Sequence, residues 1–199
     1  MKILLLFVIL AGSIKFYAQT SESYFPLEIG NKWYYSSYEH GDQVDFSKID
    51  CISEVKSIRE LMQKKFYLME TTYYNTNNSI RIIDSSYYCM TSDTLLKIDS
   101  GQPFNESSVC VYAVFSSRRF SGSLYADSLE ERITETKDFS CKAYAAMLRE
   151  KTNSTITFAY YIPHTEDFGH VITFKKNVGI IKGSALWGNN SELVKYELK

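Results

Sequence analysis

Short segments of alternating polarity, separated by Gly, Asn and Asp turns, recur along this 199-residue chain. Ile156, Phe158 and Tyr160 alternate with smaller or more polar residues, which is the period of a strand with one buried face. The segments 171–174 and 178–181 predict the two arms of a hairpin. Because no stretch is long enough for helical crossovers, we predict a mainly β fold. It would be a single antiparallel meander, forming a curved sheet or half-open barrel with at most one or two short helices.

Two stretches leave the type of element open. Residues 58–65 are compatible with a helical turn, whereas residues 66–74 have the composition of a strand. Ser128 and Glu131 have the spacing of a capping box, so a short helix could begin there, and a strand over 132–136 fits the same region equally well.

The N-terminus has the three parts of a secretory signal. Lys2 precedes the unbroken apolar run 3–11, and Ala18-Gln19 provides a small-residue exit. Roughly ten apolar residues are too few to span a bilayer, which takes about 20. No cysteine follows the run directly. We therefore predict a cleaved signal peptide over 1–19, one β-rich domain over 20–199, export to the periplasm or the extracellular space, and no transmembrane segment in the mature chain.

Charge limits the classes of partner. The predicted signal carries two lysines, so the mature chain would hold 20 cations against 23 carboxylates, a net charge of −3. Nucleic acids and anionic membrane surfaces select basic patches, so this balance argues against both.

Four cysteines remain after the predicted signal, and their spacing matches no CxxC redox or zinc pattern. An even number of cysteines in an exported protein suggests two disulfides. We favour Cys51–Cys89 with Cys110–Cys141, because this pairing joins the first cysteine to the second and the third to the fourth along the chain. The alternative is four buried thiols that act as small apolar residues.

No nucleotide loop, nucleophile elbow or zinc-protease motif is present, and we expect no cofactor. His164, Glu166 and His170 are the only cluster of metal-ligating residue types, because a tight turn could bring His170 back beside the other two. A polar surface hairpin explains the same residues. A metal-dependent hydrolase built on them is the least favoured of three functions.

Three stretches resemble a group of uncharacterised exported bacterial proteins. They are the YFPLxxGNxWxY opening over 24–35, the segment 136–144, and the segment 177–182. A Pro-Ala-Gly turn that the group usually has before Phe139 is absent here. The resemblance implies a curved antiparallel sheet like the half-open barrel of the periplasmic lipoprotein-carrier proteins, and it carries over no catalytic residues.

The leading hypothesis is a non-enzymatic binding protein whose concave sheet face holds an apolar small molecule, a lipid or a partner segment. The chain contains 16 Tyr, 12 Phe and 2 Trp, and such side chains either line a ligand site or simply fill the core. The second hypothesis is a structural or protein-interaction module that binds another envelope protein through an exposed sheet edge. The candidate ligand contacts are the large residues Trp33, Phe158, Tyr160, Phe174 and Trp187.

Overall fold

The computed structural model describes residues 23–39, 42–122, 144–161, 168–185 and 190–199. These residues form twelve strands and one short 3-10 helix, η1. The strands are β1 (Lys32–Tyr38), β2 (Cys51–Leu61), β3 (Lys64–Tyr74), β4 (Ile80–Met90), β5 (Thr94–Ile98), β6 (Cys110–Val114), β7 (Arg119–Ser121), β8 (Ala145–Lys151), β9 (Thr155–Tyr161), β10 (Phe168–Lys175), β11 (Gly179–Ala185) and β12 (Asn190–Glu197), and η1 spans Glu106–Ser108.

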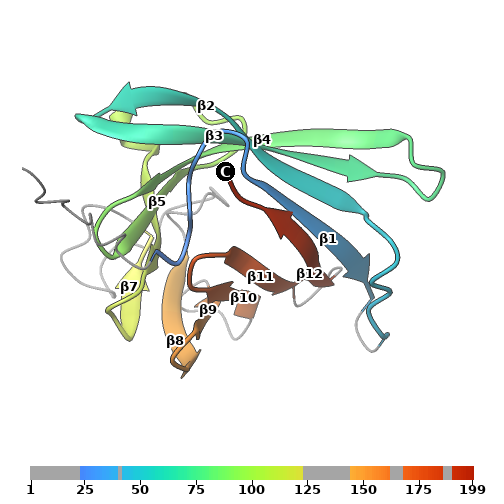
Figure 1. Ribbon diagram of the computed structural model, residues 1–199. Helices are drawn as coiled ribbons and strands as arrows, with labels where there is room; N and C mark the ends of the chain where they lie inside the picture. The colour runs from blue at the N-terminus through green and yellow to red at the C-terminus, as the bar shows by residue number, and fades with distance from the viewer. Residues whose placement is uncertain (1–22, 40–41, 123–143, 162–167, 186–189) are drawn as a thin grey trace, which may run out of the picture.

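All twelve strands belong to one antiparallel sheet in the order β6-β5-β4-β3-β2-β1-β12-β11-β10-β9-β8-β7. Except for β6 and β7, which are the two edges of the sheet, strands that are consecutive in sequence lie side by side, and β12 returns to pair with β1. The sheet curls until its two edge strands, β6 and β7, approach each other (Figure 1), and the Val111 N–H donates to the Gly122 carbonyl at 2.8 Å. The predicted fold class, an antiparallel meander bent into a half-open barrel, is confirmed.

Two hairpin turns with positive backbone φ differ in how well their sequences predict a turn. Asn177 and Gly179 adopt φ of 59° and 107° between β10 and β11, as the predicted hairpin requires. Met62 and Gln63 adopt φ of 54° and 57° between β2 and β3. A two-residue turn of this kind usually has the sequence Asn-Gly, so the sequence Met-Gln does not predict a turn here. The stretch 58–65 is therefore the tip of a long hairpin and contains no helical turn.

One end of the barrel is filled by aromatic side chains. Trp33 and Phe25 stack with ring centroids 5.8 Å apart, and Phe174 meets Phe25 edge-on at 6.4 Å. Phe25 lies on the segment before β1, which also bonds to the β10–β11 turn through the Asn177 N–H and the Ser23 carbonyl at 2.6 Å. The Trp33 indole N–H donates to the Val178 carbonyl. The N-terminal segment thus closes this end of the barrel.

A second apolar cluster lies on the outer face of β3, β4 and β5. Because side chains alternate across a strand, Cys89 faces away from its inward-facing neighbour Tyr88. Cys89 packs with Phe66, Leu96, Ile98 and Val109, and Phe104 from the loop around η1 packs against this cluster.

The predicted Cys51–Cys89 disulfide is wrong, because both thiols are free and buried. Cys51 is level with Tyr73 on β3, and Tyr73 is level with Ile82 on β4. Cys89 lies seven residues further along β4, roughly 23 Å away at about 3.3 Å per residue. A disulfide needs Cα atoms within about 7 Å. Cys110 is buried, and its predicted partner Cys141 lies outside the described residues, so that pairing stays a prediction.

Two further predictions, the signal over 1–19 and the capping box at Ser128, also lie outside the described residues. Within the described ranges, no helix has the length and apolar character needed to cross a membrane.

Candidate ligand-binding cavity

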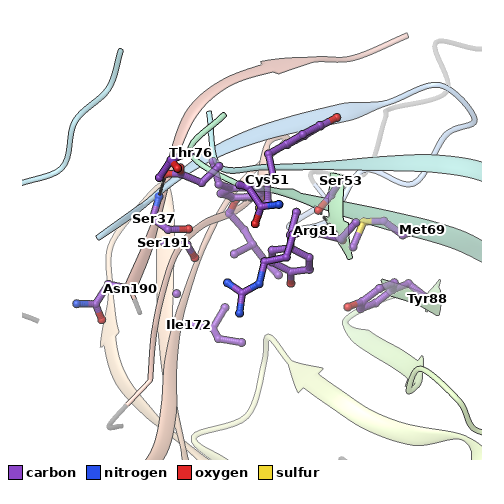
Figure 2. A pocket seen from close by; sticks show the side chains of 18 of the residues that line it. Ser37, Cys51, Ser53, Met69, Thr76, Arg81, Tyr88, Ile172, Asn190 and Ser191 are labelled. Carbon is purple, nitrogen blue, oxygen red and sulfur yellow. Dashed lines mark hydrogen bonds between the residues drawn. The ribbon is translucent and has the colours of Figure 1, made fainter. Parts of the chain in front are cut away.

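The end of the barrel opposite Trp33 and Phe25 is hollow. A cavity of about 900 Å³ lies among β1–β4, β6 and β10–β12, and Figure 2 shows its lining. The lining residues are Tyr35, Ser37, Asp50, Cys51, Ser53, Met69, Thr71, Tyr73, Tyr74, Asn75, Thr76, Asn77, Arg81, Tyr88, Tyr112, Ile172, Ile180, Gly183, Asn190 and Ser191.

The hollow exists because inward positions at this end carry small side chains. Ser53 on β2 lies opposite Thr71 on β3, and their hydroxyl oxygens are 2.8 Å apart. Across the cavity, Gly183 on β11 lies opposite Ser191 on β12. A barrel interior is normally filled by its inward side chains, so a run of small residues leaves space.

The lining combines apolar surface with groups that stay neutral. Burial raises the pKa of the Cys51 thiol to about 12, so it remains protonated and is no nucleophile. Burial also raises the pKa of the Tyr35 hydroxyl well above its usual range, and this hydroxyl donates to the Ile180 carbonyl at 3.0 Å. Met69 and Ile172 contribute purely apolar surface. This wall suits the apolar part of a ligand.

Two charged side chains line the cavity. Asp50 lies at the rim. One of its carboxylate oxygens accepts a hydrogen bond from the Ser37 N–H at 2.7 Å and lies 3.5 Å from the Ser36 hydroxyl. Arg81 extends from β4 toward Ile172 (Figure 2). Within the described part of the chain, Arg81 forms no ion pair.

Asn190, at the start of β12, has a buried acceptor atom without a described hydrogen-bond donor. The side chain is 5% exposed, and its Oδ1 atom has no hydrogen-bond donor among the described residues. An unsatisfied buried carbonyl typically costs about 1–3 kcal/mol. Asn190 is also a lining residue of the cavity, and its Oδ1 atom is enclosed by protein.

A buried ionic group lies beside the cavity-lining residues Tyr88 and Tyr112. The Lys97 ammonium is 2.7 Å from an Asp99 carboxylate oxygen and lies over the rings of Tyr112 and Tyr88, at 4.9 and 5.7 Å from their centroids. Burial lowers the pKa of Lys97, but Tyr112 and Asp99 outweigh it and the pKa is raised. His170 stacks on the Tyr160 ring with centroids 4.5 Å apart, and burial, reinforced by the Lys97 charge, lowers its pKa to about 4. The pKa shifts favour a charged Lys97 and, at neutral pH, an uncharged His170, and neither residue lines the cavity.

The large residues predicted to contact a ligand lie mainly in the packed core. Trp33, Phe158 and Phe174 are at most 1% exposed, Tyr160 is buried beside them, and none of the four lines the cavity. Trp187 lies outside the described residues. Contact between these five residues and a ligand stays a prediction.

Of the three predicted metal ligands, His170 is the one that lies among the described residues. His164 and Glu166 lie outside the described residues, and His170 packs between Tyr160 and Tyr144. The described ranges contain no group of three His, Cys, Asp or Glu side chains that could hold a metal ion.

The comparisons with known proteins are limited to fold. No family model and no curated protein matches the sequence. Two crystal structures are similar: an inferred lipoprotein from Parabacteroides distasonis, and an inferred exported protein with a YmcC-like fold from Bacteroides fragilis. The first is 11% identical with a TM-score of 0.44, over 88% of this chain and 99% of that one. The second is 10% identical with a TM-score of 0.45, over 89% of this chain and 100% of that one.

Proposed function

We propose that this chain is an exported, non-enzymatic binding protein that holds the apolar part of a ligand in the hollow end of its barrel. The observation that carries the proposal is the cavity of about 900 Å³. Small-molecule sites typically enclose about 300–1,000 Å³ and combine apolar walls with a few polar groups. Binding explains why the chain keeps small inward residues where larger ones would complete the core.

The test fills the cavity from one strand. Thr71→Trp places a large ring into the cavity from β3. Thr72→Trp is the matched control, because the neighbouring side chain on a strand points to the opposite face. Binding is measured with the neutral fluorescent probe N-phenyl-1-naphthylamine, and lipid extracted from protein purified from its own cell envelope is analysed by mass spectrometry. Thermal unfolding of each variant verifies that it is folded.

We expect Thr71→Trp to lose probe binding and copurified lipid, and Thr72→Trp to keep both. Ser53→Leu fills the same space from β2 and should weaken the probe in parallel, which guards against a folding defect specific to Thr71→Trp. Probe binding that is unchanged in the folded cavity-filling variants would refute the proposal.

A further inference from the structure

Arg81 lines the cavity because the pairing of β3 with β4 is irregular at this residue. Tyr73 pairs with Ile82 and Tyr74 pairs with Ile80, so Arg81 is an extra residue on β4 with no partner across the ladder. A β-bulge of this kind redirects a side chain relative to the regular alternation of a strand. Figure 2 shows the result, with the Arg81 guanidinium extending into the cavity toward Ile172.

The Arg81 guanidinium forms no ion pair with a carboxylate of the described residues. Asp50 is the only carboxylate among the described lining residues, and one of its two oxygens accepts from the Ser37 N–H and lies 3.5 Å from the Ser36 hydroxyl. Asp84, the nearest acid along β4, does not line the cavity. A guanidinium presents five donors in a planar fork that matches a carboxylate or a phosphate. The unused charge therefore points to an anionic group on the ligand.

The surroundings of Arg81 determine which kind of anion fits. Deeper in the cavity, Ile172, Met69 and Tyr88 form apolar wall. A small hydrated anion would gain nothing from these surfaces, whereas an acyl chain attached to the anion would bury them.

We infer that the ligand is an anionic amphiphile, an acyl chain with a carboxylate or phosphate head, and that Arg81 binds the head while the chain extends toward Ile172. This inference rests on the proposed function, because it names the ligand class of the same cavity. It gives the ligand a direction, with the head at the rim near the β3–β4 hairpin and the chain end nearest the packed core.

The test compares four C12 compounds below their micelle concentrations at pH 8: dodecanoate, dodecyl phosphate, neutral dodecanol and cationic dodecyltrimethylammonium. Each displaces N-phenyl-1-naphthylamine from the wild type, from Arg81→Gln and from Arg119→Gln. Arg119 is the matched control, because it is an exposed arginine on β7 that does not line the cavity. Arg81→Lys tests whether charge alone suffices.

We expect the wild type and Arg119→Gln to bind at least one of the two anions about tenfold more tightly than dodecanol, which is the usual value of a charge-assisted hydrogen bond. Whether dodecanoate or dodecyl phosphate binds better identifies the head. Arg81→Gln should bind the anions no better than dodecanol, and Arg81→Lys should be intermediate. Raising the salt from about 0.05 to 0.5 M should reduce the preference, because this arginine is exposed.

The outcomes separate the two proposals. If dodecanol and the cation bind the wild type as tightly as the anions, or if Arg81→Gln keeps the anion preference, the inference is overturned and the proposed function stands. If neither the probe nor any C12 compound binds the wild type, the proposed function fails, and the inference fails with it.

Discussion

His170 should make the protein lose stability in mild acid. Its ring stacks on Tyr160, meets Tyr144 edge-on, and lies in the fields of Lys97 and Asp99. Burial and the Lys97 charge lower its pKa from 6.5 to about 4. The unfolded chain therefore takes up this proton near pH 6.5 and the folded chain only near pH 4. Between these values the unfolded state binds more protons, so stability falls as the pH falls.

The size of this loss follows from the two pKa values. A gap from 6.5 to about 4 corresponds to about 3 kcal/mol at about 1.4 kcal/mol per pH unit. Between pH 7 and pH 5 the free energy of unfolding should fall by about 2 kcal/mol. The contribution is complete above pH 6.5 and is lost once the pH reaches about 4.

The assay is urea unfolding followed by intrinsic fluorescence at several pH values from 7 to 5, in the wild type and in His170→Phe. Phenylalanine keeps the stacking on Tyr160 and removes the titration. Above pH 5 the carboxylates whose pKa values are lowered, among them Asp93 and Glu54, remain ionised. The other two histidines are present in both proteins, so their effect cancels in the comparison. Equal losses of stability in the two proteins would refute the assignment to His170.

Three further predictions concern the fold itself. Because the Phe158 ring is fully buried, Phe158→Ala should destabilise the protein by about 3–5 kcal/mol and Phe158→Leu by about 1 kcal/mol. Equal urea midpoints for the wild type and Phe158→Ala would contradict this. Gln63→Gly should stabilise it by about 0.5–1 kcal/mol in thermal unfolding, because glycine relieves the positive φ of 57°, and a lowered melting temperature would argue against the turn. Alkylation in denaturant, followed by intact mass, should label only Cys51 and Cys89 when no reductant is present. With reductant it should label all four cysteines. Four labels without reductant would rule out the predicted Cys110–Cys141 disulfide.

The fold class could be predicted because strand periodicity is a local property. The alternation at Ile156, Phe158 and Tyr160 appears in the structure as three buried residues on one face of β9. The β2–β3 hairpin was harder, because Met62 and Gln63 adopt a backbone that their side chains do not favour, and the long pairing of β2 with β3 imposes it. At Met62 and Gln63, strand pairing thus overrides the backbone preference of the individual residues.

The candidate site could not be predicted in the same way, because it depends on closure. Arg81 and Ser191 lie over a hundred residues apart in the sequence, and only the return of β12 to β1 places them around one cavity. The sequence drew attention to large aromatic residues, which mark the filled end. A signal did exist in the small residues Ser53 and Thr71 at inward strand positions, but single Ser and Thr residues are ordinary in strands.

The sequence of β1 indicates which end of the barrel is packed and which is hollow. Its inward side chains shrink along the strand, from Trp33 through Tyr35 to Ser37, and only the last two line the cavity. Phe25, which stacks on Trp33, lies on the segment immediately before this strand, so the large end of β1 is also the end that is closed. The hollow end of the barrel is therefore the Ser37 end. That is also the end from which the β3–β4 hairpin projects (Figure 1), with Arg81 on its cavity side. The stretch from Phe25 to Ser37 thus sets which end of the barrel is packed and which is hollow, and Arg81 on β4 lines the hollow end.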